Sequence, residues 1–448
     1  MADLAFEPAH VLARKLRRRE ITAEALMRLY LDRIARFNPK LNAIVVLDAD
    51  KAMEGAREAD RELARGEVKG PLHGLPVTVK ESFDVAGWKT TWGNPDWKDN
   101  VAAADSAVVE RYKRAGAIVF GKTNVPRMLG DNQAYNEIYG RTCNPWNLER
   151  TPGDSSGGSS AALAAGLTGL EAGSDLGGSL RNPAHYCGIY AHKPSLNIVP
   201  GRGHAPPGVV GGNDTLAVVG PMARSAEDLD LALGLLAGAD GALATAWKLD
   251  LPPAVADGFK DLRVAVWADD PRSPIDAAVG DRLQAAVEAI ARAGATIGDT
   301  ARPDADLAHA GYERLMSGGM ESARDMSAWL EARSKLRLAW AKFFESWDVL
   351  ICPIAPVTAF PHTTETDWRK RFVTVNGGRV PDGADLFWAG LATVSHLPST
   401  AAPTGIARDG LPAGLQIIGA FGRDRTTIAA AKWLEKLVGG FVPPPGWT

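Results

Sequence analysis

Cysteine is scarce in this sequence, and long apolar runs are missing from it. Three cysteines, Cys143, Cys187 and Cys352, lie at scattered positions among 448 residues. This odd, dispersed set supports neither a disulfide framework nor a zinc site, so we expect a cytoplasmic protein rather than a secreted one. No stretch approaches the ~18 consecutive apolar residues of a membrane-spanning helix. No basic segment followed by an apolar core marks a signal peptide at the N-terminus.

The sequence also lacks an excess of charge of either sign. It has 50 lysines and arginines against 53 aspartates and glutamates, which gives a formal net charge of −3. This balance offers no electrostatic reason to expect nucleic acid or an anionic membrane as the main partner. Hydrophobic residues make up 46% and charged residues 23% of the chain, which is ordinary for a well-packed globular protein.

Segments with helical and strand-like patterns alternate along the chain. Helical spacing is found over 7–36, 49–65, 104–115, 225–238, 276–294 and 305–346, and strand-like patterns over 77–79, 117–120, 262–267 and 349–352. This alternation predicts an α/β fold whose sheet is covered by helices on both faces. Since no internal repeat or clean linker interrupts it, we expect a single domain over 1–448. The polar segment 361–385 is predicted to be a surface loop near the site.

Two short motif matches stand in the wrong surroundings. Residues 116–123 fit the phosphate-binding pattern G-x-x-x-x-G-K-T, but the intervening residues form an apolar strand where the chemistry needs a loop. Residues 153–157 fit G-x-S-x-G, but the preceding segment is polar with two prolines, not the apolar strand of a nucleophile elbow. Among the eight histidines, His396 stays a conceivable partner for a serine, and His192 is expected to be structural.

Lys80 and a second serine–glycine segment offer chemistry that needs no histidine. Lys80 follows an apolar strand, so we expect its amine near the interior, where burial lowers the pKa of lysine and allows it to act as a base. Ser179 follows two glycines in the segment 173–181. Such glycines let the backbone approach a substrate closely and leave N–H groups for a developing oxyanion. The plainer alternative is a set of tight turns with an exposed lysine at a strand end.

Together these segments resemble the amidase signature family. The resemblance rests on residues 153–194, with G-D-S-S-G-G-S-S-A-A-L-A-A-G, then G-S-D-L-G-G-S-L-R-N-P-A-H-Y-C-G, then H-K-P. Similar landmarks are L-P-V-T-V-K-E from Leu75, G-K-T-N-V-P from Gly121, N-P-W from Asn144 and G-L-P-A-G-L-Q-I-I-G from Gly410. The similarity covers about 70–240 and 395–435. It is thinnest over 305–385, which is expected to build a pocket wall or lid.

The resemblance implies a single large α/β domain with a mixed central sheet, and it assigns roles to particular residues. Ser179 would be the nucleophile, Ser155 a bridging serine after a cis peptide bond, and Lys80 the base. Backbone N–H groups of an oxyanion hole would come from Leu176, Gly177, Gly178 and Ser179. Asp175 and Arg181 would support this loop. The family's chemistry needs neither a metal nor a cofactor.

The resemblance also implies a class of substrates. Met128, Leu129 and Gly130 lie in a segment like the one that lines the acyl pocket of fatty acid amide hydrolases, although ordinary core packing is the alternative. Such a lining favours a small hydrophobic amide or anilide, with carbamates and esters left open. The main alternative is the A-type component of the tRNA-dependent amidotransferase, which works within a tRNA-modifying complex. A non-catalytic relative is disfavoured by the intact triad, and a homodimer stays open.

Two residues depart from the family pattern. Asp154 stands beside the bridging serine, where many relatives have glycine. A carboxylate there would stabilise the charged form of Lys80 and raise its pKa. Asn182 stands where the family usually has a branched apolar residue, and we expect it to form a hydrogen bond rather than to contact substrate.

Overall fold

A mixed eight-stranded sheet forms the centre of the molecule. The computed structural model describes residues 2–209, 216–303, 322–365, 367 and 370–447. The strand order is β10-β9-β11-β15-β14-β7-β8-β6. The strands are β6 (Glu171–Asp175), β7 (Tyr190–Lys193), β8 (Val218–Ala223), β9 (Arg263–Val266), β10 (Thr296–Gly298), β11 (Val349–Pro353), β14 (Ser399–Ile406) and β15 (Pro412–Gly419). β9 pairs in parallel with β10 and β11, and the other neighbours are antiparallel.

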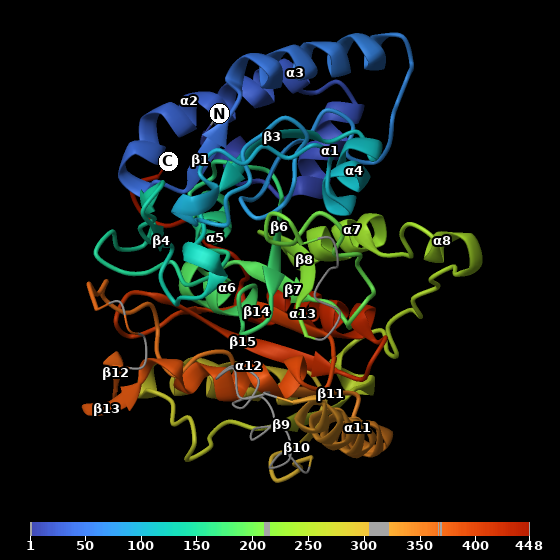
Figure 1. The fold of residues 1–448 in the computed structure, drawn as a ribbon. Helices are drawn as coiled ribbons and strands as arrows, with labels where there is room; N and C mark the ends of the chain where they lie inside the picture. The colour runs from blue at the N-terminus through green and yellow to red at the C-terminus, as the bar shows by residue number, and fades with distance from the viewer. Residues whose placement is uncertain (1, 210–215, 304–321, 366, 368–369, 448) are drawn as a thin grey trace.

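Helices cover both faces of this sheet, as predicted. They are α5 (Gly157–Ala164), α6 (Arg181–Cys187), α7 (Ala226–Leu236), α8 (Leu243–Ala246), α9 (Ala277–Arg292), α11 (Ala323–Ser346), α12 (Asp385–Thr393) and α13 (Asp424–Val438). Alternate side chains of a strand point to opposite faces. In β11, Val349 and Ile351 accordingly join one core with α7, α9 and α13. Leu350 and Cys352 join another core with α11 and α12, which lie together below β15 in Figure 1.

The strand that carries Lys80 belongs to a second, smaller sheet. β1 (Ile44–Leu47), β3 (Ile118–Thr123) and β2 (Pro76–Lys80) form three strands in that order. They lie among the helices α1 (Ala9–Arg17), α2 (Ala23–Leu41), α3 (Ala49–Ala64) and α4 (Ala107–Arg114), at the top of Figure 1. The predicted strands at 77–79 and 117–120 are confirmed, but they do not join the central sheet.

Two predictions about local structure are wrong. The single helix expected over 7–36 is two helices, because Arg19 adopts a left-handed φ of 58° and the Thr22 hydroxyl then caps α2 by accepting from the Ala25 N–H. The loop expected over 361–385 contains a hairpin, β12 (Phe372–Val375) and β13 (Gly378–Pro381). Its turn is Asn376-Gly377, both with positive φ, a strong hairpin signal. Part of the predicted helical stretch 305–346 is α11, and 304–321 lies outside the described residues.

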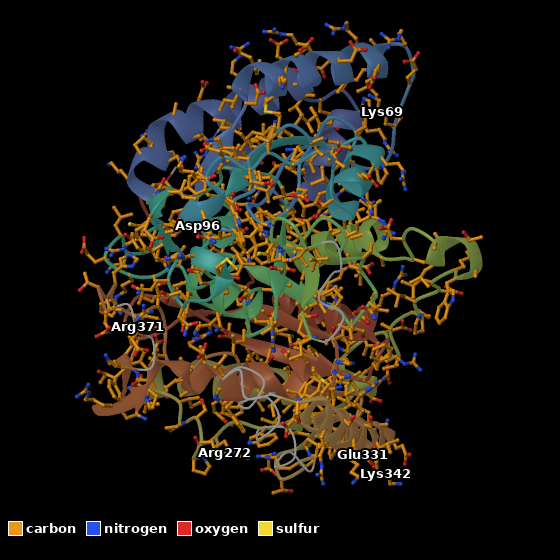
Figure 2. The ribbon with its side chains drawn as sticks, in the orientation of Figure 1. Lys69, Asp96, Arg272, Glu331, Lys342 and Arg371 are labelled. Carbon is orange, nitrogen blue, oxygen red and sulfur yellow. The ribbon has the colours of Figure 1, made fainter. Side chains whose placement is uncertain are left out.

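Shorter elements complete the described chain. They are β4 (Tyr135–Asn136), β5 (Gly140–Arg141) and the 3₁₀ helices Ala2–Phe6, Pro95–Trp97, Arg127–Leu129, Phe259–Asp261 and Asp382–Ala384. Charged side chains such as Lys69, Glu331 and Lys342 point outward at the edges of Figure 2, with 56%, 68% and 80% of their side-chain surface exposed. Among the described helices, none has the length and hydropathy required to cross a membrane.

Candidate active site

Lys80 is the last residue of β2 and is fully buried. Its Nζ donates to the hydroxyl of Ser155 at 2.6 Å and to the hydroxyl of Ser174 at 2.9 Å. Burial lowers the pKa of Lys80 to about 7, while the nearby carboxylates of Asp154 and Asp175 act in the opposite direction. A large fraction of this amine is therefore neutral near pH 7, which is the form that can accept a proton.

Ser155 lies in a buried loop that leads into α5. The peptide bond between Asp154 and Ser155 is cis. Gly153 has a φ of 82°, and a Cβ there would come within 2.8 Å of the Pro183 backbone, so only glycine fits this approach. Close packing against α6 thus holds the chain just before Ser155.

Ser179 lies in a loop between β6 and α6 that is organised by a buried ion pair. The Asp175 carboxylate accepts from the N–H groups of Gly178 and Leu180 at 3.0 and 3.1 Å. Arg181 donates to the same carboxylate at 2.8 and 3.0 Å. Burial opposes ionisation, yet the Arg181 guanidinium holds the pKa of Asp175 at about 2. Both residues occupy the supporting positions that were predicted for them.

The two serine loops meet beside Lys80. The Ser156 N–H donates to the Ser179 carbonyl at 3.3 Å. Ser179 is partly exposed, whereas Lys80 and Ser155 are buried. Among the four predicted oxyanion donors, Gly178 already donates its N–H to Asp175. Leu176, Gly177 and Ser179 are partly exposed, and Gly178 is buried.

Sequence analysis missed Ser174 as a polar contact of Lys80. Its hydroxyl accepts from the amine at 2.9 Å, close to the 2.6 Å of the Ser155 contact. The available signal was its place in β6, directly before Asp175, near the end of a strand that leads into the nucleophile loop. Ser174 therefore helps to fix the direction of the buried amine.

Asn182 forms a hydrogen bond, as predicted, but with a residue far away in the chain. Its Nδ2 donates to Oδ2 of Asp385 at 2.5 Å, across 203 residues. Asp385 is the first residue of α12. Sequence analysis did not single out this partner, because local spacing carries no information about a contact at that separation.

The segment with Met128, Leu129 and Gly130 is a surface feature rather than core. Met128 is 42% exposed and Leu129 is partly exposed. Both residues have left-handed φ values, 56° and 58°, which are uncommon outside glycine. The Met128 N–H donates to the carbonyl of Trp92 at 2.7 Å, and Trp92 itself has a φ of 53°. The role of this segment in binding substrate stays a prediction.

The motif matches that were set aside lie in structural positions. The G-K-T end of 116–123 falls within strand β3, and Lys122 donates to Thr90 Oγ1 at 2.9 Å. His192 is buried, with Nδ1 2.9 Å from Thr400 Oγ1 and Nε2 3.1 Å from Asp424 Oδ1. It thus connects β7 to β14 and α13. His396 is buried in the connection between α12 and β14.

Comparison with known proteins identifies the family. A family model for amidases matches residues 25–329 and 313–428. The chain belongs to the amidase family. The prediction of an amide-hydrolysing enzyme with the amidase signature fold is confirmed at this level.

Relatives of this amidase chain have different activities in their names. The A-type component of the glutamyl-tRNA(Gln) amidotransferase of Acidothermus cellulolyticus is 32% identical, over 93% of this chain and 92% of that protein. The indoleacetamide hydrolase of Bradyrhizobium diazoefficiens is 31% identical, over 95% of this chain and 86% of that protein. The crystal structure of a bacterial aryl acylamidase of the amidase signature family superposes with a TM-score of 0.84. It is 24% identical, with 96% of each chain covered, so it bears on the fold alone.

Proposed function

We propose that this amidase hydrolyses the C–N bond of an amide through an acyl-enzyme on Ser179, with Lys80 as base and Ser155 as proton relay. The observation that carries the proposal is the 2.6 Å hydrogen bond between the buried Lys80 amine and the Ser155 hydroxyl. Burial supplies the low pKa, and the loop contact through Ser156 brings the partly exposed Ser179 to the same place.

The proposed reaction has two acyl-transfer steps. Neutral Lys80 takes the proton of Ser155, Ser155 takes that of Ser179, and Ser179 Oγ attacks the carbonyl carbon. Backbone N–H groups of the loop stabilise the tetrahedral oxyanion, where one donor is worth ~3 kcal/mol. The proton then passes to the leaving amine as the C–N bond breaks. Water, deprotonated by the same relay, attacks the ester, and Ser179 is released as the carboxylic acid departs.

The proposed substrate is a small hydrophobic or aryl amide, with aryl carbamates and esters as further candidates. The exposed side chain of Met128 and the partly exposed side chain of Leu129 offer an apolar wall. Apolar walls with a few placed polar groups are typical of small-molecule sites. The indoleacetamide hydrolase, 31% identical, has an aromatic amide in its name.

The alternative function is that of an amidotransferase component of the A type, which would act on glutamine within a tRNA-modifying complex. It is favoured by the 32% identity to such a component over nearly the whole chain. The two functions differ in their need for a partner, because a hydrolase turns over substrate as an isolated chain.

The test is turnover by the purified full-length chain on an acyl anilide, an aryl carbamate, a primary amide and free glutamine. Ser179→Ala is the nucleophile variant. Ser225→Ala is the matched control, since this serine caps α7 and its loss affects stability by only ~1 kcal/mol. We expect turnover of an apolar substrate that is lost in Ser179→Ala and kept in Ser225→Ala. Activity that survives in Ser179→Ala would overturn the mechanism, and glutamine turnover alone would favour the amidotransferase.

A further inference from the structure

The nucleophile loop rests on one face of α12. Arg181 donates from Nη1 to the Ala389 carbonyl and from Nη2 to Thr393 Oγ1, both at 3.0 Å. The neighbouring Asn182 donates to Asp385 at 2.5 Å. Positions 385, 389 and 393 are spaced by one helical turn and therefore share a face of α12. Two consecutive residues of α6 thus bind the same helix, which makes α12 a platform beneath the loop.

Asn182 also touches the loop itself. Its own N–H donates to the Gly178 carbonyl at 2.7 Å. A Cβ built on Gly178 would lie 2.8 Å from Asn182 Oδ1 and 3.0 Å from both Cγ and Nδ2, so the amide group lies flat against this glycine. Gly178 has a φ of 103° and stands between Gly177 and Ser179, which carry the proposed oxyanion donors. A displaced Asn182 side chain would therefore leave Gly178 free to move.

The hydrogen bond between Asn182 and Asp385 is buried and incompletely satisfied. The two residues are 1% and 2% exposed. Asn182 Oδ1 and Asp385 Oδ1 find no hydrogen-bond partner among the residues that the structure describes. Buried acceptors without partners cost stability, and an apolar side chain of similar size would avoid that cost. A polar pair at this place is therefore better explained by geometry than by stability.

We propose that Asn182 and Asp385 are positioning residues that fix Gly178, and with it the oxyanion-binding loop, against α12. The inference rests on the proposed function of Ser179 and goes beyond it, because neither residue touches the reacting atoms. Asp385 sets the direction of the Asn182 amide, and the amide sets the path of the backbone at Gly178. The pair acts on the transition state, where the oxyanion forms, and leaves ground-state binding unchanged.

The test uses the full chain with Asn182→Ala, Asn182→Leu, Asp385→Ala and Asp385→Asn. We expect kcat to fall about 10- to 100-fold in the first three variants, as for small misplacements of catalytic groups, with KM within about threefold. The affinity for an aryl boronic acid, which forms a tetrahedral adduct on serine, should fall by the same factor as kcat. Asp385→Asn should restore most of kcat, because an amide oxygen can still accept from Asn182. The double variant Asn182→Ala/Asp385→Ala should be no worse than either single one.

Several outcomes separate this inference from its alternatives. All rates are divided by the concentration of active serine, titrated with a fluorophosphonate, so misfolded protein does not count. Asn38→Ala is the control, because its side chain bonds to backbone groups of residues 43 and 44 in the other sheet region and should affect stability alone. Unchanged kcat and boronate affinity in Asn182→Ala and Asn182→Leu would overturn the inference. Full activity in Ser179→Ala would instead overturn the proposed function.

Discussion

The two serine–glycine loops of this amidase differ in their exposure and in the forces that hold them. The loop with Ser155 is buried, and close backbone packing fixes it, as at Gly153 against Pro183. The loop with Ser179 is partly exposed, and the ion pair between Asp175 and Arg181 organises it. The difference separates two tasks that need different surroundings.

Proton transfer and acyl transfer have opposite requirements for water. A lysine keeps a pKa of about 7 only where burial penalises its charged form, so Lys80 and its relay belong in the interior. The nucleophile must meet a substrate that arrives from solvent, so Ser179 belongs at the boundary. Packing suits the first loop because it excludes water. An ion pair suits the second because it directs several N–H groups without covering them.

The largest expected effect comes from removing either end of the proposed relay. Ser179→Ala and Lys80→Ala should each lower kcat by ~10⁴-fold or more, because residues that act as a unit fail together. The double variant should then be no slower than the single ones. Single-turnover kinetics on an anilide substrate measure this directly. Multiplicative losses in the double variant would show that the buried and the exposed loop act independently.

The next effect concerns the ion pair that holds the exposed loop. Asp175→Asn leaves Arg181 charged and buried, a change that typically costs about 3–5 kcal/mol of the free energy of unfolding. Urea titration measures that loss. The pKa of Asp175 is lowered from 3.8 to about 2, so its stabilisation is present above pH ~4 and disappears as the pH falls towards 2. The wild type should therefore lose stability over that window, and the variant should lack this part of the acid transition.

Asp348→Asn is the matched control for the ion pair. Asp348 also pairs with an arginine, Arg263, but the arginine side chain is 45% exposed. Such an exposed pair is worth about 0–1 kcal/mol. Equal losses for Asp175→Asn and Asp348→Asn would contradict the view that burial gives the loop's ion pair its importance.

The predictability of this fold followed the range of the interactions. Helix α3 and strand β2 were predicted within a few residues, because their apolar periodicity is local. The break between α1 and α2 depends on a single left-handed residue, Arg19, and the pattern of apolar residues continues across it. The hairpin at 372–381 was missed although Asn376-Gly377 signals its turn, because the polar composition of 361–385 was given more weight.

The candidate site shows the same limit. Lys80, Ser155 and Ser179 could be proposed from contiguous motifs, because each stands in a short segment with a characteristic pattern. Ser174 and Asp385 could not, since their importance comes only from contacts across 94 and 203 residues. The different exposure of the two serine loops was equally hidden, because both segments have the same glycine- and serine-rich composition.

A smaller effect should follow from filling the space that packing leaves for the buried loop. In Gly158→Ala, the new Cβ would lie 2.3 Å from the backbone nitrogen of Asn124, so strand β3 or helix α5 must shift. Overpacking of this kind costs typically 1–3 kcal/mol of the free energy of unfolding. Gly201→Ala is the control, since nothing lies within 4 Å of a Cβ there. Equal thermal midpoints for the two variants would show that the buried loop tolerates movement.

The smallest expected effect is a shift in the pH dependence of the buried relay. The free amine of Lys80 is the base, so kcat/KM should rise with pH through a pKa of about 7. The Asp154 carboxylate favours the charged amine and raises that pKa, although burial raises the pKa of Asp154 itself and so reduces its charge. Asp154→Asn should therefore move the acid-side limb to lower pH by less than about one unit. Asp48→Asn, at the exposed cap of α3, should leave it in place. A limb that is unmoved or shifted to higher pH in Asp154→Asn would show that Lys80 does not sense this carboxyl group, and that burial alone sets its pKa.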